Sequence, residues 1–184
     1  MKCMRRGREK ERVIRMLEPQ EVNVQARKKE KENMKFRAFL KNHGDEETLD
    51  KQFLELHQKL FDGYDCSKCR NCCKMYAGSI PREDIGKDAA YLHMTEEAFI
   101  KQYLCRNSIT GAYETIHSPC DFLQENGECL LGECKPENCV KYPYTDQPER
   151  LWSLYSVLEA VEVCPVAFEI YEQLKKEYGF KGNR

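Results

Sequence analysis

Apolar side chains recur on one side of the segment 47–61. They stand at steps of four, three and four residues, which is the spacing of an amphipathic helix that turns one face toward a core. Gly63 follows the segment, and glycine is common where a helix ends. The pattern therefore predicts a helix over 47–61 whose buried face carries Leu49, Phe53, Leu56 and Leu60.

Two further helices are predicted toward the C-terminus. One is expected over 149–162, and the other begins after Cys164-Pro165 and runs to Tyr178. Proline suits the first turn of a helix because the N–H that it lacks would be unpaired there, and Gly179 suits the stop. The second helix carries an apolar stripe of Ala167, Ile170, Tyr171, Leu174 and Tyr178.

The middle of the chain lacks such long periodic segments. Thr95 precedes two glutamates, which is typical of the N-cap of a short helix, and we expect Cys105 to be buried at the end of that helix. Asn126-Gly127 predicts a hairpin, and many Pro, Asn and Gly residues over 110–145 indicate turns. We expect a mostly helical α+β fold, in which N- and C-terminal helices flank a small cysteine-rich, turn-rich core with short hairpins.

Charge is distributed unevenly along the chain. Residues 1–35 contain 12 Lys and Arg against 6 Glu, a net charge of +6, which leaves 18 basic and 25 acidic residues in the remainder, a net charge of −7. We interpret residues 1–45 as a charged helical arm, with a solvated helix, a pause at Pro19, and then a second charged helix that runs through Gln25 to about Lys41. Residues 46–184 would form the cysteine-cluster domain, with its core over 64–170. The basic arm also offers a contact for an acidic protein partner.

Composition excludes some classes of function. The formal net charge of −1 argues against a nucleic-acid partner, and no apolar stretch is long enough for a membrane helix. The first 20 residues carry positive charge without an apolar stretch, so we expect no secretory signal and a cytoplasmic protein. Disulfides are rare in reducing compartments, so the 11 cysteines indicate metal or redox chemistry.

The strongest chemical signal is the run Cys66-Ser-Lys-Cys69-Arg-Asn-Cys72-Cys73. Cysteines separated by two residues can turn their sulfurs toward one metal ion. With the remote Cys164-Pro165, the spacing is similar to the way bacterial ferredoxins hold a [4Fe–4S] cluster, although Cys73 interrupts the ferredoxin pattern. Four thiolates suit structural zinc as well, so the metal stays open. Because Cys72 and Cys73 are adjacent, we expect their side chains to point apart.

Four more cysteines follow in turn-rich sequence. Burial as small apolar side chains would explain one or two cysteines, but not eight that are paired in sequence and placed at turns. The weakest ligand candidates are Cys3, Cys105 and Cys134. The four cysteines of this later region are Cys120, Cys129, Cys134 and Cys139.

Some cations and histidines near the cysteines could take part in the site. His117 lies three residues before Cys120 and is a candidate ligand or hydrogen-bond partner, whereas His57 is expected to be packed or solvated. The cations near the first run either stabilise thiolates or are ordinary surface charges. They are Lys68, Arg70 and Lys74.

Several sequence blocks occur together in a recognisable order. They are the run 66–73, Pro119-Cys120-Asp121-Phe122-Leu123, Gly127-Glu128-Cys129, the segment from Lys135-Pro136 to Pro143-Tyr144, and Cys164-Pro165. Over residues 64–170 the chain thus resembles the YkgJ-type CxxCxxCC cysteine-cluster family, with Lys135 where the family often has Arg. The resemblance implies a domain that chelates zinc or iron, in some members as an iron–sulfur cluster. The implied ligands are Cys66, Cys69, Cys72, Cys73, Cys120, Cys129, Cys139 and Cys164.

Eight thiolates could form two tetrads, or one tetrad with bystanders. We expect one centre at Cys66, Cys69, Cys72 and Cys164. The remaining four would form a second centre or its surroundings, and these are Cys73, Cys120, Cys129 and Cys139.

Three functions stay open. The first is a metal-binding protein without catalysis, and the second is an iron–sulfur oxidoreductase or electron carrier. The third is a component related to protein lysine N-methylation, because a related cysteine cluster accompanies flagellin lysine N-methylases. The chain contains no GxGxxG, P-loop or nucleophile motif, so whether it is an enzyme also stays open.

Removal of the metal is expected to unfold residues 64–165 and to leave the flanking helices partly formed. Thiolate binding of zinc supplies roughly 10–16 kcal/mol, which is comparable to the stability of a whole domain. Limited proteolysis before and after treatment with a chelator measures this. Near-native resistance of the cysteine-rich segment after complete metal removal would contradict it.

Overall fold

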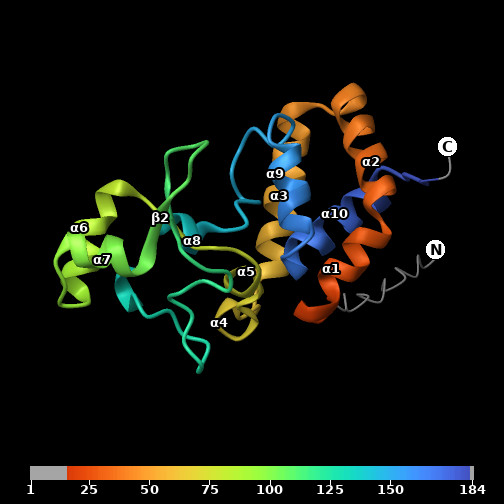
Figure 1. Cartoon of the computed structure of the whole chain (residues 1–184). Coiled ribbons are helices and arrows are strands. Elements are labelled where there is room, and N and C mark those ends of the chain that lie inside the picture. The colour runs from red at the N-terminus through yellow and green to blue at the C-terminus, as the bar shows by residue number, and fades with distance from the viewer. Residues whose placement is uncertain (1–15, 183–184) are drawn as a thin grey trace, which may run out of the picture.

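The chain forms a helical part and a smaller cysteine-rich part (Figure 1). The computed structural model describes residues 16–182. In this range no helix is long and apolar enough to cross a bilayer. The helical part contains helices from the N-terminal and from the C-terminal segments of the described residues. Its helices are α1 (Pro19–Lys28), α2 (Glu30–His43), α3 (Glu46–Phe61), α9 (Leu154–Val161) and α10 (Pro165–Glu177).

Helix α3 is the one that the apolar periodicity predicted. Asp45 caps it by accepting a hydrogen bond of 2.9 Å from the Thr48 N–H. Helix α10 packs against α3 and α9, and its Tyr171 meets Phe36 of α2 edge-on, with ring centroids 5.2 Å apart. The resulting core buries Leu49, Phe53, Leu56, Leu60, Val157, Ala167, Ile170 and Leu174.

The two N-terminal helices are part of this core. The prediction of one charged helix that follows Pro19 and runs through Gln25 to about Lys41 is wrong, because Lys29 separates α1 from α2 and each helix buries one face. The many charged positions obscured a narrow apolar stripe of Val22, Ala26, Phe36 and Leu40. Residues 1–15, with Cys3 and the first predicted helix, lie outside the described range. The division of the chain at residue 45 stays a prediction.

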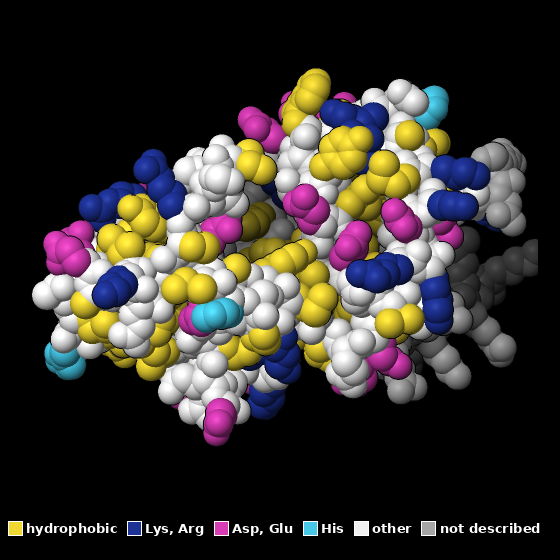
Figure 2. Space-filling view, viewed as in Figure 1, with side chains coloured by type: hydrophobic (Ala, Val, Ile, Leu, Met, Phe, Trp, Pro, Cys, Tyr) yellow, Lys and Arg dark blue, Asp and Glu magenta, His cyan; other side chains and the backbone are white. Residues whose placement is uncertain are grey.

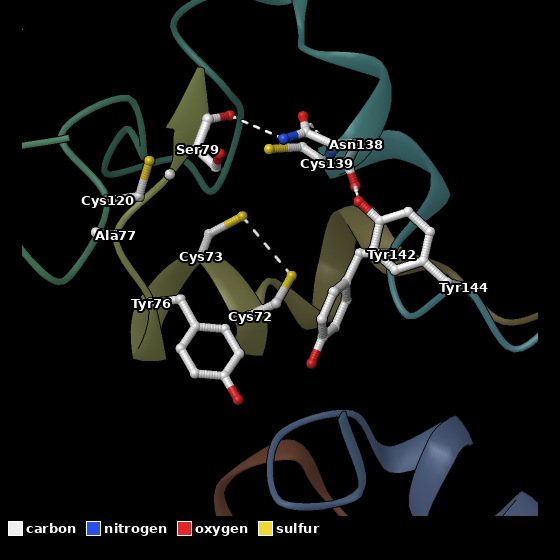
Figure 3. A pocket seen from close by; sticks show the side chains of 11 residues that line it. Cys72, Cys73, Tyr76, Ala77, Ser79, Cys120, Asn138, Cys139, Tyr142 and Tyr144 are labelled. Atoms are coloured by element: carbon white, nitrogen blue, oxygen red, sulfur yellow. Dashed lines mark hydrogen bonds between the residues drawn. The ribbon is translucent and has the colours of Figure 1, made fainter. Parts of the chain in front are cut away.

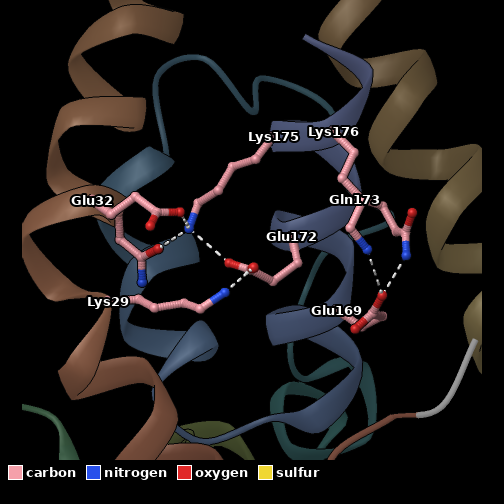
Figure 4. Close-up of polar contacts among 8 residues, drawn as sticks. Lys29, Glu32, Glu169, Glu172, Gln173, Lys175 and Lys176 are labelled. Atoms are coloured by element: carbon pink, nitrogen blue, oxygen red, sulfur yellow. Dashed lines mark hydrogen bonds and ion pairs between the residues drawn. The ribbon is translucent and has the colours of Figure 1, made fainter. Parts of the chain in front are cut away.

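A buried polar network fastens α10 to the N-terminal helices (Figure 4). The Lys175 side chain is 4% exposed, and its ammonium group donates hydrogen bonds of 2.5–2.8 Å to Glu32, Asn33 and Glu172. Lys29, at the junction of α1 and α2, also pairs with Glu172. Burial alone would raise the pKa of Glu172, but the hydrogen bonds from the two lysines lower it overall. Each charge in the network therefore depends on its partners.

The cysteine-rich part is built from short elements. Three strands, β1 (Ser79–Ile80), β2 (Leu104–Arg106) and β3 (Tyr113–Thr115), form an antiparallel sheet in the order β1-β3-β2. Its helices are α4 (Cys66–Cys69), α5 (Asn71–Met75), α6 (Ile85–Tyr91), α7 (Glu96–Tyr103) and α8 (Glu137–Lys141), with single 3₁₀ turns η1 (Arg82–Asp84) and η2 (Gly132–Cys134). Its own small core contains Ile80, Ile85, Ala89, Phe99, Leu104, Phe122 and Leu131. The expected mostly helical α+β fold is thereby confirmed.

Local predictions in this part have mixed outcomes. Thr95 caps α7 by accepting from the Ala98 N–H, as expected. The predicted hairpin is reduced to one bridge, Leu123 to Cys129, around a turn in which Gly127 has φ +85°. Cys105 is neither helical nor buried: it lies exposed in β2, because the chain straightens into a strand at Leu104.

The sequence pattern predicted the start of one C-terminal helix correctly and the start of the other too early. Helix α10 begins at Pro165 as predicted, and Gly179, with φ +58°, follows its end. The helix predicted over 149–162 begins only at Leu154. Glu149 has φ +62°, and its N–H and that of Arg150 donate to the Asp50 carboxylate at 2.8 Å each, which holds this stretch as a turn.

Replacement of the buried ammonium group is expected to destabilise the helical part. In Lys175→Met the carboxylate of Glu172 loses a buried partner, and uncompensated charges of this kind cost about 3–5 kcal/mol. Urea unfolding at pH 7 measures the free energy. Lys176→Met is the matched control, because this side chain is 65% exposed on the same helix. A loss no larger than that of the control would contradict the role of the network.

Asp88 of α6 provides a pH-dependent prediction. Its side chain is fully buried, and neither carboxylate oxygen has a hydrogen-bond partner among residues 16–182. Burial raises its pKa to about 6, so the folded state binds this proton more tightly and loses stability as pH rises from about 4 to about 6. Asp88→Asn should therefore stabilise the protein at pH 7.5 by about 1–2 kcal/mol.

The stabilising effect of Asp88→Asn should shrink at pH 5, where the native carboxyl is protonated as well. Urea unfolding of both proteins at the two pH values measures this. Asp84→Asn is the control, because that carboxylate pairs with Lys87 and is partly exposed. A destabilised Asp88→Asn protein at pH 7.5 would show that the ion pair with Lys87, whose ammonium lies 4.0 Å from Asp88 Oδ1, outweighs the cost of burying the carboxylate.

Candidate metal centre

The cysteine run occupies the junction of the two parts of the molecule. Asp65 caps α4 by accepting from the Ser67 N–H at 2.9 Å. Arg70 then adopts a left-handed conformation, with φ +50° and ψ 19°, and α5 starts at once. The run is therefore two short helical turns joined by a sharp reversal, and this shape brings Cys66, Cys69, Cys72 and Cys73 to one region.

Cys72 and Cys73 do not point apart as expected. Their sulfurs lie 3.9 Å from each other, and both face the cavity drawn in Figure 3. The prediction is wrong because adjacent residues are only about 100° apart around a helix, whereas they alternate in a strand. Two sulfurs on one tetrahedral ion are separated by roughly 3.8 Å, given bonds of about 2.3 Å. The pair has the spacing for one ion, and it also suits two neighbouring centres.

Cys66, Cys69 and Cys164 form a first group of thiols. Burial raises the pKa of Cys164 to about 12, and the charges of Cys66 and Cys69 act in the same direction. Cys164 stands directly before α10, where the N–H groups of Ala167 and Val166 face its sulfur and favour the thiolate. Cys72 also interacts with Cys164.

The second group consists of Cys73, Cys120, Cys129 and Cys139. Burial raises the pKa of Cys139 to about 11, and the three other thiols of the group also raise it. The pKa of Cys73 is instead lowered to about 6, first by its hydrogen bond with Cys72 and then by two cations. The expected partition into two sets of four stays a prediction, because the sulfur of Cys72 lies 3.9 Å from that of Cys73, which the partition assigns to the other set.

Arg70 and Lys135 are the cations that act on the thiols. Both help to lower the pKa of Cys73, and both oppose the burial that raises the pKa of Cys129 overall, so they would also offset the negative charge of a thiolate centre. Lys68 pairs with Asp65 instead. Of the alternatives left open by the sequence, these contacts favour thiolate stabilisation for Arg70 and a surface charge for Lys68.

A cavity of about 160 Å³ separates several of the thiols from a wall of tyrosines (Figure 3). Cys72, Cys73, Cys120 and Cys139 line one side. No charged residue lines it, so its surface is mostly apolar. The tyrosines of the wall are Tyr76, Tyr142 and Tyr144.

The chemistry of the donors fits zinc or an iron–sulfur cluster, since both take thiolate tetrads. Over residues 16–182, however, no three Cys, His, Asp or Glu side chains stand close enough together to hold a metal ion as they are. Binding therefore requires the sulfurs within each group to turn toward a common point. Nine of the ten described cysteines are at least partly accessible, the buried Cys164 lines a cavity, and none of the ten forms a disulfide.

The remaining candidates lie apart from these groups. The imidazole Nδ1 of His117 is 2.7 Å from the Asp121 carboxylate, and His117 is 71% exposed. The imidazole of His57 contacts the Thr145 hydroxyl at 2.8 Å. Cys134 lies in η2 and belongs to neither thiol group.

Tyr64 is a residue of the site that sequence reasoning missed. Burial raises its pKa, and so does a hydrogen bond between its hydroxyl and the Cys69 sulfur. Its only signal in the sequence is its position two residues before Cys66. Hydrogen bonds to ligand sulfurs tune the properties of metal centres, so Tyr64 is placed to influence the first group.

Comparison with known protein families agrees with this geometry. A family model described as "CxxCxxCC: Putative zinc- or iron-chelating domain" matches residues 65–164. The chain belongs to the CxxCxxCC family. The matched range begins just before the first cysteine of the run and ends at Cys164, so it contains both thiol groups. No curated protein and no solved structure matches the chain.

Proposed function

We propose that this CxxCxxCC protein holds inorganic centres through two sets of four thiolates, as iron–sulfur clusters or zinc. The proposal rests on one observation: cysteines that are far apart in the sequence come close together in the fold. Cysteines separated by up to 98 positions in sequence, from Cys66 to Cys164, line two neighbouring cavities at the junction of the molecule. The eight ligands are Cys66, Cys69, Cys72 and Cys164 in the first set, and Cys73, Cys120, Cys129 and Cys139 in the second.

A metal-binding role explains an arrangement that is otherwise unfavourable. Thiolates held close together repel one another, and burial adds to the cost of their charge. Neighbouring thiols and burial raise the pKa of Cys139 and Cys164 to about 11 and about 12. A bound metal cation would lower the pKa of these thiols, because a thiol that coordinates a metal is deprotonated outright. The metal would then contribute to the stability of the junction itself.

The residues around the thiols have definite tasks in this proposal. Arg70 and Lys135 offset negative charge on the second set, and the first turn of α10 stabilises the thiolate of Cys164. The hydroxyl of Tyr64 donates a hydrogen bond to the Cys69 sulfur. When bound, zinc would supply a structural link, whereas an iron–sulfur cluster would also carry electrons.

Paired substitutions test the two sets separately. Cys69→Ser with Cys164→Ser should remove roughly half of the bound metal, and Cys129→Ser with Cys139→Ser the other half, since each pair takes two ligands from one tetrad. Metal is measured by elemental analysis of protein purified without oxygen. Cys105→Ser is the matched control, because this thiol is exposed in β2 and outside both sets.

A visible spectrum of the same samples identifies the centre. Absorbance that bleaches on reduction indicates an iron–sulfur cluster and supports an electron carrier, while colourless protein with stoichiometric zinc indicates a structural role. If one pair of substitutions removed all metal and the other none, the two-centre assignment would be wrong. Wild-type protein with neither iron nor zinc in stoichiometric amount would overturn the proposal.

A further inference from the structure

A second cavity, larger than the one between the thiols, opens on the other side of the tyrosine wall. It has a volume of about 700 Å³, which lies in the range of small-molecule sites. Figure 2 shows a hollow between the two parts of the molecule, with hydrophobic side chains inside it. We call this cavity the α9 cleft, because Ser153, Ser156 and Val157 at the start of α9 form one side of it.

Arg150 is a buried cation in the α9 cleft. It is 7% exposed, and its guanidinium donates only to the backbone carbonyl oxygens of Tyr144 and Pro148. These bonds engage three of the five N–H groups of an arginine. Asp50 and Asp146 are near enough to raise its pKa against the effect of burial, but no carboxylate among residues 16–182 forms an ion pair with it. Buried arginines usually have such a partner.

The start of α9 adds a second feature that favours an anion. The N-cap residue Ser153 makes no capping hydrogen bond with its side chain, so the first N–H groups of this eight-residue helix lack that partner. Its hydroxyl donates backward instead, to the carbonyl oxygen of Glu149 at 3.1 Å. Unpaired N–H groups and the helix dipole attract negative charge. The cleft thus presents a guanidinium and a helix N-terminus together.

The opposite side of the α9 cleft is aromatic. Tyr76 and Tyr142 are nearly perpendicular, as are Tyr142 and Tyr144, with ring centroids 6.3 Å apart in each pair. Tyr144 is held with φ +59°, which is uncommon for a bulky residue, and its hydroxyl donates to the Asn138 carbonyl at 2.7 Å. Strain of this kind is often maintained at binding sites. Such rings offer faces on which a flat group can pack.

We propose that the α9 cleft binds a small organic anion with a flat apolar body, such as an aromatic carboxylate. Its carboxylate would lie between the guanidinium of Arg150 and the N-terminus of α9, and its ring against the tyrosine wall. The carboxyl group of Glu159 at the rim disfavours a second negative charge at the outer end, so a monoanion fits best. The proposal does not depend on the thiol groups binding metal.

Calorimetric titration of the full chain with phenylacetate tests the site. Binding is expected with a dissociation constant on the order of 1–10 mM for a ligand of this size. Phenylacetamide, which has the same shape without the charge, should bind at least about tenfold more weakly, because a charge-assisted hydrogen bond contributes about 1.5–3 kcal/mol. Equal affinity for the two compounds, or no saturable binding of phenylacetate, would overturn the proposal.

Three variants locate the binding. Arg150→Gln should abolish phenylacetate binding, and Lys41→Gln, which removes a half-buried cation over the Trp152 ring outside the cleft, should leave it unchanged. Ser156→Phe fills the cleft from an exposed position without touching the contacts of Arg150, so it should also abolish binding even if Arg150→Gln fails to fold. Unchanged binding in Ser156→Phe would place the ligand elsewhere. Metal content measured on each sample separates this result from a failure of the metal-binding proposal.

Discussion

The structure depends on the gathering of thiols between two small cores. The eight candidate ligands come from α4, α5, the turns around Cys120 and Cys129, α8, and the start of α10, and most of them line two cavities there. Each core is closed mainly by its own apolar residues, so the junction relies on polar and thiol groups. Repulsion among thiolates makes such a junction unstable unless a positive charge lies within it. The bound metal of the proposed function would supply that charge.

The two parts of the molecule contribute differently to this junction. The helical part supplies rigidity: α10 is fixed by apolar packing and by the network around Lys175, and its first turn carries Cys164. The cysteine-rich part supplies seven of the eight candidate thiols from short elements and the turns between them. Binding of a common centre would require these sulfurs to turn by rotation of their side chains.

The tyrosine wall connects the thiols with the α9 cleft. Tyr76, Tyr142 and Tyr144 line both the thiol cavity and the cleft beside α9. Tyr76 is tied to α9 through the carbonyl of Glu159, and Tyr144 to α8 through that of Asn138. A molecule bound in the cleft would therefore contact the same rings that line the thiol cavity. Under the two proposals, this arrangement would bring a small ligand close to the proposed centres.

Local signals in the sequence determined much of this protein. The apolar period located α3 and α10, the cap residue Thr95 located the start of α7, and the CxxCxxCC run identified the family, because each of these depends on neighbouring residues. Tertiary contacts decided the rest. The carboxylate of Asp50, about 100 residues away, delays the start of α9, and the core recruits α1 and α2 despite their charge. Only the fold could place Arg150 in a cleft beside tyrosines, since burial and the choice of hydrogen-bond partners are properties of three-dimensional packing.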